Sequence, residues 1–204
     1  MTDLSIVRKQ SQNYLLQIND ENGAAIDLTD AVVKFAVKRT FSDLNADAII
    51  FKSTYDDTEI VPTDLPNGQV TVRILVSDTD GVNPGNYCWD VVVNRRGTAK
   101  SAAGSLGLQA GQYVVLGTGL DFDEMAVGDI VVPAGSTAAN QRQFEVEELG
   151  GSGGDNDPGA GNIRTDYNGF DATESGIVFT LFEGDRKYPS GLSGTFTITK
   201  EISN

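Results

Sequence analysis

The chain has 204 residues, 39% of them hydrophobic, which is enough to build one large domain or two small ones. An excess of 29 acidic over 15 basic residues gives a net charge of −14 and argues against nucleic acid or an anionic membrane as a partner. The sequence has no histidine and one cysteine, which excludes Ser-His-Asp and Cys-His nucleophiles, most zinc sites and an intrachain disulfide.

The first half of the chain alternates apolar and polar residues with the period of two that is typical of half-buried strands. In the clearest of these segments, Lys34 and Lys38 lie on the face opposite to Phe35. The expected strands are 14–18, 32–38, 48–52, 70–76, 87–93 and, near the end of the chain, 194–200. Residues 77–80 predict a turn or a single helical turn.

Turn signals separate these strands, at residues 20–23, 66–68 and 83–86. Asn and Gly in these segments supply the left-handed conformations that tight turns require. Strands of about six residues at a spacing of about ten, with no helical periodicity between them, predict a β-sandwich.

The stretch from about 105 to 191 is richer in glycine, alanine and acidic residues. It still contains strand-like segments, at 113–116, 129–132, 144–147 and 176–182. A low-complexity run that begins with Gly-Gly-Ser-Gly-Gly-Asp predicts a flexible loop at 150–162, because glycine loses the most backbone entropy on ordering.

Three sets of residues carry a resemblance to a known family. Residues 23–35, Gly-Ala-Ala-Ile-Asp-Leu-Thr-Asp-Ala-Val-Val-Lys-Phe, resemble a "G-x-x-x-D-L-T-G-A-x-V-x-F" opening, with Asp30 in place of its glycine. Residues 67–72 and 84–91 resemble a central hairpin and a "P-G-x-Y-x-x-D" strand, and 193–198 resemble a closing "G-x-F-x-I" strand. This pattern resembles immunoglobulin-like domains of tailed-bacteriophage virion proteins, such as the N-terminal domain of the phage baseplate upper protein family.

The resemblance covers about residues 10–100 and 192–202. About 90 residues separate the segment 97–104 from the closing strand, where the family has a short hairpin. Hairpin tips tolerate such insertions. We therefore expect an all-β chain: an immunoglobulin-like β-sandwich of residues 1–105 plus 192–204. A second small β-rich domain, barrel- or hairpin-like, is expected at 106–191 inside the last hairpin of the sandwich.

The expected insert carries its own motif. Residues 117–122 and 127–132, Gly-Thr-Gly-Leu-Asp-Phe and Val-Gly-Asp-Ile-Val-Val, are similar to a "G-T-G-x-x-F…V-G-D-x-I" motif of small β-barrel or hairpin modules in phage tail and fibre proteins. "V-G-D-x-I" also occurs in many unrelated small barrels. Segments 144–146 and 177–179 are the expected partner strands.

Two acidic groups raise the question of a cation site. Residues 155–157 follow a glycine run and resemble one turn of a calcium-binding nonapeptide repeat, but a single turn does not complete that site. Asp121, Asp123, Glu124 and Asp129 offer oxygen ligands, yet their spacing is not that of a calcium loop, and a solvated turn is favoured.

Other side chains favour structural roles over chemistry. Cys88 has no histidine to form its thiolate, while its neighbours Tyr87 and Trp89 share one strand face and are expected in the core. The basic residues Arg95 and Arg96 precede a glycine and are interpreted as a solvated hairpin tip.

Glu145, Glu147 and Glu148 alternate with apolar residues. A glycosidase would use two such carboxylates, but carboxylates on strand faces are common in β proteins. We therefore predict no catalytic, cofactor-binding or metal-ligating residues and no cofactor.

The resemblance implies a non-enzymatic structural part of a tailed-phage particle, in the tail, baseplate or fibre-attachment region. Its partners would be other virion proteins and copies of itself, with a host surface as a further contact and with no nucleic acid or membrane insertion. Sheet edges and residues 1–12 are candidate docking surfaces. Because the first residues lack a secretory signal, we expect synthesis in the host cytoplasm and a final place in the virion. The alternatives are a capsid decoration or host-surface-binding adhesion module and, ranked lower, a carboxylate-dependent cell-wall hydrolase.

Overall fold

The computed structural model of the chain describes residues 3–43, 45–55, 58–101, 103–112, 114–120, 123–134, 143–150, 161–165, 170, 172–187, 189 and 192–200. The fold is all-β, as the sequence predicts. The chain divides into two compact units, Met1–Val93 with Lys187–Asn204 and Asn94–Arg186.

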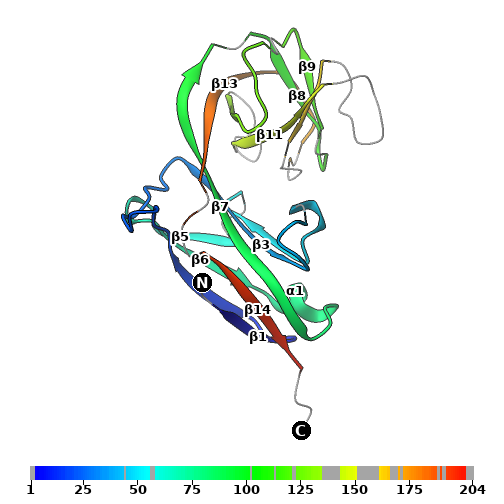
Figure 1. Cartoon of the computed structure of the whole chain (residues 1–204). Helices are drawn as coiled ribbons and strands as arrows, with labels where there is room; N and C mark the ends of the chain where they lie inside the picture. The colour runs from blue at the N-terminus through cyan, green and yellow to red at the C-terminus, as the bar shows by residue number, and fades with distance from the viewer. Residues whose placement is uncertain are drawn as a thin grey trace. The chain divides into compact units, whose positions relative to one another are not determined.

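The first unit contains two sheets (Figure 1). One sheet has the order β1 (Leu4–Val7), β14 (Ser193–Thr199), β7 (Gly85–Lys100), β3 (Ala31–Lys38) and β4 (Ile50–Ser53). The other has the order β2 (Gln12–Gln17), β6 (Gln69–Ile74) and β5 (Ile60–Asp64). Three short helices lie in the connections: η1 (Asn45–Asp47), η2 (Leu65–Asn67) and α1 (Val76–Asp80). β1 runs parallel to β14, whereas the other pairs whose register is known in these sheets are antiparallel.

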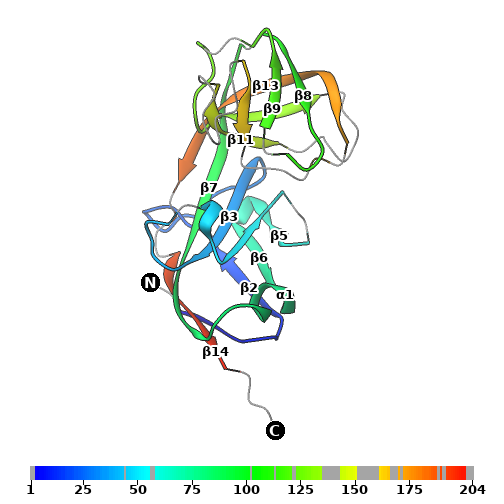
Figure 2. The same ribbon diagram turned by 90° about the vertical axis from the view of Figure 1, so that its right-hand side faces the viewer.

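Both sheets of this unit contribute side chains to a single hydrophobic core. Figure 2 shows β2 and β6 on one side of the unit and β14 on another. At the centre, the rings of Phe35 and Trp89 lie 5.6 Å apart and those of Phe35 and Phe196 lie 6.4 Å apart. All three side chains are fully buried, which makes them a large hydrophobic contribution to folding.

β3 is buried on both faces, which the alternation of its residues did not predict. Its apolar residues face the core as expected, but Lys34 and Lys38 are only 4% and 6% exposed. Lys38 is tolerated there because its ammonium group forms an ion pair with Asp90 of β7, with the two atoms 3.1 Å apart.

The second unit contains a closed barrel of six strands. In order around the barrel they are β13 (Glu174–Lys187), β10 (Ile130–Ala134), β11 (Phe144–Leu149), β12 (Ile163–Thr165), β9 (Val114–Thr118) and β8 (Ser105–Leu108), which pairs back with β13. Closure removes the free strand edges that an open sheet leaves exposed.

The inside of the barrel is filled by apolar side chains such as Leu108, Val115 and Leu181, with Phe144 packed edge-on against Phe170. Elsewhere in this unit, the backbone segments at Gly128 and Gly184 approach each other closely. A Cβ atom on Gly184 would lie 1.8 Å from the carbonyl oxygen of Gly128, so only glycine fits there.

The units are divided within β7, at residue 93, and at residue 186 of β13, whereas the sequence places the division after 105 and before 192. Of the expected flexible loop at 150–162, only Gly150, Gly161 and Asn162 belong to the described residues. No helix within the described ranges is long and apolar enough to cross a membrane.

Candidate functional site

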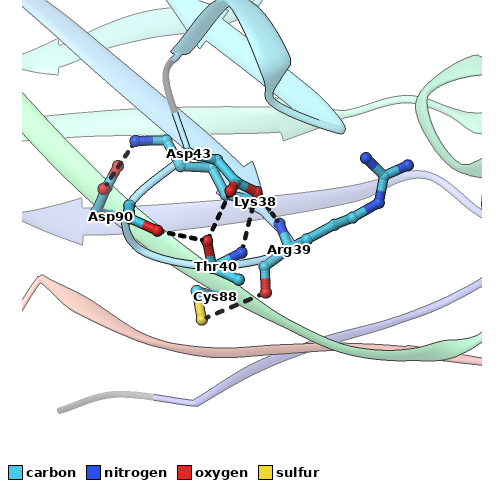
Figure 3. A network of polar contacts seen from close by, with 7 residues as sticks. Lys38, Arg39, Thr40, Asp43, Cys88 and Asp90 are labelled. Carbon is cyan, nitrogen blue, oxygen red and sulfur yellow. Dashed lines mark hydrogen bonds and ion pairs between the residues drawn. The ribbon is translucent and has the colours of Figure 1, made fainter.

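A polar loop follows β3 and is folded around one carboxylate. Asp43 accepts hydrogen bonds from the backbone N–H groups of Arg39 and Thr40, both at 3.1 Å, and from Thr40 Oγ1 at 2.6 Å (Figure 3). A short polar side chain that bonds to nearby backbone groups stabilises a turn in this way. The hydrogen bond from the Thr40 side chain, followed by that from its backbone, holds the pKa of Asp43 below its usual value.

The base of the loop is fixed to β7. Besides the ion pair of Lys38 with Asp90, the thiol of Cys88 points to the carbonyl oxygen of Arg39, 4.0 Å away (Figure 3). The Arg39 side chain extends away from these contacts. The only cysteine in the sequence is therefore part of the loop's support.

Beside this loop lies a hollow of about 280 Å³. It is lined by Arg39, by residues 47–49 from the end of η1 to the start of β4, by residues 81–83 after α1 and by Tyr87 of β7. We call this feature the hollow. It brings together two parts of the chain that are far apart in the sequence, the connection from β3 to β4 and the segment 81–87.

The polar groups of the hollow differ in how they are held. Tyr87 Oη donates a hydrogen bond to the carbonyl oxygen of Asn83 at 2.6 Å, and the Tyr87 side chain packs partly against the core of the unit. Within the described part of the chain, neither the Arg39 guanidinium nor the Asp47 carboxylate has a hydrogen-bond or ion-pair partner. The hollow thus offers one guanidinium and one carboxylate whose hydrogen-bonding groups are open, although the charge of Arg39 also helps to lower the pKa of Asp43.

The acidic cluster expected at 121–129 does not form as a group. Asp123 and Glu124 are exposed, while Asp129 is 3% exposed and Asp121 lies outside the described residues. Asp129 Oδ2 accepts hydrogen bonds from the Ala126 N–H at 2.8 Å and from Lys100 Nζ at 2.7 Å. The expectation that these acids are all solvated is wrong for Asp129, since it is a buried ion-pair partner.

No group of three or more potential metal ligands occurs among the residues that the structure describes. Residues 155–157, the other candidate for calcium, lie outside them.

The three glutamates of β11 also have separate environments. Glu145 is fully buried and forms an ion pair with Arg186. Glu147 lies 3.8 Å from Arg164 and is exposed, as is Glu148. Arg186 neutralises the charge of Glu145, which suits a structural carboxylate better than a reacting one.

The basic run 95–97 is not a hairpin tip, because β7 continues through it to Lys100. Arg96 donates from Nε to Gln143 Oε1 at 2.6 Å, and its guanidinium carbon lies 5.5 Å from the ring centroid of Phe182. These contacts hold the strand extended where the sequence indicated a turn.

No pattern in the sequence predicts the hollow. Asn83 and Gly85 were interpreted only as turn residues, and Arg39 and Asp47 stand in no motif. Tyr87 was expected in the core with Trp89; Trp89 is fully buried, whereas Tyr87 is partly buried and also reaches the hollow.

Comparison with known proteins finds no family model that matches the chain and no curated protein with significant sequence similarity to it. The geometry of the chain itself therefore carries the functional argument.

Proposed function

We propose that this chain is a non-enzymatic structural component of a tailed-bacteriophage particle, in the tail, baseplate or fibre-attachment region. It acts by docking to other virion proteins and to copies of itself. The first unit is, in this proposal, an immunoglobulin-like sandwich, and the barrel is a module inserted into it.

The strand pairing of the first unit supports this assignment. The segments that resemble the phage family lead into or lie in β3, β6, β7 and β14. β14 pairs antiparallel with β7, with Thr195 opposite Cys88, so the closing strand returns to the sheet after the whole barrel. A hairpin interrupted by an insert is expected to pair in this way.

The observation that carries the proposal is the state of the buried acids. Asp129 and Glu145, two of the residues considered for ion binding or catalysis, are engaged in ion pairs with Lys100 and Arg186. A catalytic acid needs a position facing substrate and a pKa suited to its task. Carboxylates paired with cations in the wall of a barrel support a role in stability, with function placed on the surface.

Docking by strand addition is restricted at two edges of the first unit, β1 and β5. Residues 4–7, part of the expected docking segment 1–12, already pair with β14. The carbonyl of Ser5 accepts from Tyr14 Oη at 2.6 Å, and the carbonyl of Val7 accepts from the Gln10 N–H at 3.1 Å. β5 carries Pro62, which cannot donate to a new strand. Docking therefore uses loops and sheet faces more than the edges of β1 and β5.

The experiment is to purify the phage particle whose genome encodes the chain, identify its proteins by mass spectrometry and locate the chain by electron cryo-microscopy. We expect a symmetric ring of copies at the tail or baseplate, in contact with neighbouring proteins. Density on the capsid surface would favour a decoration protein instead. Absence of the chain from purified particles would contradict the proposal.

The hollow favours one alternative, a host-surface-binding adhesion module, because a structural role does not require a guanidinium and a carboxylate without hydrogen-bond partners in one concavity. The two functions are compatible in a protein that is exposed on the particle.

A further inference from the structure

We propose that the hollow is a binding site for a neutral saccharide. The site does not depend on the chain being a phage component, so the tests of the two proposals fail independently. Its ligand is inferred from the four side chains whose chemistry faces the hollow: Arg39, Asp47, Asn83 and Tyr87.

The first observation in favour of a saccharide is the open hydrogen-bonding capacity of Arg39 and Asp47. The Arg39 guanidinium only donates hydrogen bonds and the Asp47 carboxylate only accepts them. Arg39 acts electrostatically on Asp43, but neither group has a hydrogen-bond or ion-pair partner in the described part of the chain, so both have their hydrogen-bonding capacity available. A sugar hydroxyl both donates and accepts, so adjacent hydroxyls on one ring satisfy a donor-only and an acceptor-only group together. The Asn83 side-chain amide adds one acceptor and two donors.

The second argument is the partly apolar, prearranged wall. Ile49 and Val82 pack against the core, and Tyr87 is held by its hydrogen bond to the Asn83 carbonyl. An aromatic ring that lines a hollow and is fixed in this way can pack against the C–H groups of a sugar ring without losing rotamer freedom on binding.

Charge selects a neutral ligand over an ionic one. One cation and one anion in the hollow cancel, and the net charge of −14 disfavours the approach of an anion. A zwitterionic amino acid would satisfy Arg39 and Asp47 but would leave the ring of Tyr87 without its matching C–H face. The hollow therefore fits a polyol ring better than a small ion pair.

Size limits the ligand to one or two sugar rings. The volume of about 280 Å³ lies just below the range of about 300–1,000 Å³ that is typical of pockets for drug-sized molecules. Because the polar groups that bind are exposed to water, we expect dissociation constants in the millimolar range, about −4 kcal/mol.

The test is an NMR titration of the ¹⁵N-labelled full chain with neutral hexoses, 6-deoxyhexoses and N-acetylhexosamines, with glycine and inorganic phosphate as comparison ligands. We expect saturable shifts for at least one sugar, confined to the amides of residues 47–49, 81–83 and 87. Glycine and phosphate should give weaker shifts at these amides.

Asp47→Asn and Asn83→Ala change exposed side chains and should leave the rest of the spectrum unchanged. Asp47→Asn exchanges a charge-assisted hydrogen bond for a weaker neutral one and Asn83→Ala removes one, so each should weaken sugar binding about tenfold. Glu21→Gln is the matched control, because it removes one exposed negative charge outside the hollow. The proposal is overturned if no sugar gives saturable shifts, if glycine or phosphate binds more tightly, or if Asp47→Asn binds as well as Glu21→Gln.

Discussion

The two units bury charges of opposite sign. In the first unit the lysine is the buried member of each pair: Lys38 is 8% exposed and Asp90 24%, and Lys52 is 5% exposed and Asp78 16%. In the barrel the acid is the buried member, since Asp129 is 4% exposed and Lys100 25%. In both units a charge in a β wall is tolerated only with a partner that reaches it from a wetter position.

The side chains explain this difference. A lysine covers a sheet with its long aliphatic stem and brings its ammonium group to acids on neighbouring elements. Aspartate and glutamate are shorter, so in the barrel the acid stays at the strand and Lys100 or Arg186 extends to it. In both cases, removal of the wetter partner leaves an uncompensated buried charge, and the following predictions test that asymmetry.

The largest effect is expected in the barrel when the cation is removed. Lys100→Met leaves the buried Asp129 carboxylate with only the Ala126 N–H, and we expect a loss of about 3 kcal/mol in the free energy of unfolding. Asp129→Asn keeps an acceptor for Ala126 and should cost less. Urea unfolding monitored by far-UV circular dichroism measures both variants. If Asp129→Asn lowers the free energy of unfolding by more than Lys100→Met does, removal of the wetter partner is not the more costly change in the barrel.

Gly184→Ala tests the close backbone contact of the barrel. The new methyl group would collide with the Gly128 carbonyl, so we expect a loss of about 2–3 kcal/mol. Gly81→Ala is a control for the simple loss of glycine, because its Cβ position is open and its φ of −88° is one that alanine adopts readily. Amide hydrogen exchange of the barrel strands reports the effect, and equal exchange in both variants would contradict the contact.

In the first unit the acid is the partner whose loss should cost more. Burial by itself lowers the pKa of Lys52, but the hydrogen bond from its ammonium group to Asp78 and the charge of Glu59 outweigh burial and raise the pKa above its usual value. Asp78→Asn leaves the buried ammonium with Glu59 alone, and we expect a loss of about 1–2 kcal/mol.

Trp89 is the only tryptophan and lies in the core of the first unit, so its fluorescence follows unfolding of this unit. Lys52→Met removes the buried charge itself and is the comparison variant. If Asp78→Asn lowers the free energy of unfolding by less than Lys52→Met does, loss of the acid does not cost more than loss of the buried lysine, and the proposed asymmetry is wrong for this pair.

The smallest effect concerns alkaline pH and Tyr14. Burial raises the pKa of Tyr14 to about 12 from an ordinary value of 10.0, so the folded state holds the phenol proton more tightly than the unfolded state does. The stabilisation of the folded state that follows from the raised pKa of Tyr14 is fully present below pH 10 and is lost as the pH rises to about 12.

Tyr14→Phe should cost about 1 kcal/mol at neutral pH, because it removes the hydrogen bond to the Ser5 carbonyl, and should reduce the loss of stability between pH 10 and 12. Trp89 fluorescence in urea at each pH measures both effects. An unchanged alkaline slope in Tyr14→Phe would assign that slope to other groups, such as Lys52, whose raised pKa implies loss of stability above pH 10.5.

Much of the strand pattern could be predicted because period-two alternation and turn residues are local signals. β3, β6, β10 and β14 overlap the segments expected from them. β5 was missed because Pro62 argues against a strand, although an edge strand accepts it, and β8 and β12 were missed because they are short.

The prediction of a hairpin tip at the basic run in β7 was wrong for a different reason. Gly97 was interpreted as a turn residue, but a Cβ atom there would lie 2.9 Å from the Glu183 carbonyl oxygen, so glycine serves a close approach of two strands. The hollow could not be predicted at all, since it exists only where the connection from β3 to β4 meets residues 81–87, far away in the sequence. Such sites depend on tertiary contacts that no local pattern encodes.

We propose that the buried carboxylates Asp129 and Glu145 stabilise the fold and do not perform chemistry. The most direct measurement is particle assembly and infectivity with the double variant Lys100→Met, Asp129→Asn, which removes both charges and keeps the acceptor for Ala126. We expect the double variant to be more stable than Lys100→Met alone. Under the proposed phage function, particles with the double variant should assemble and infect as well as particles with the unmodified chain. A folded, incorporated double variant that has lost infectivity would contradict the account and return Asp129 to a functional role.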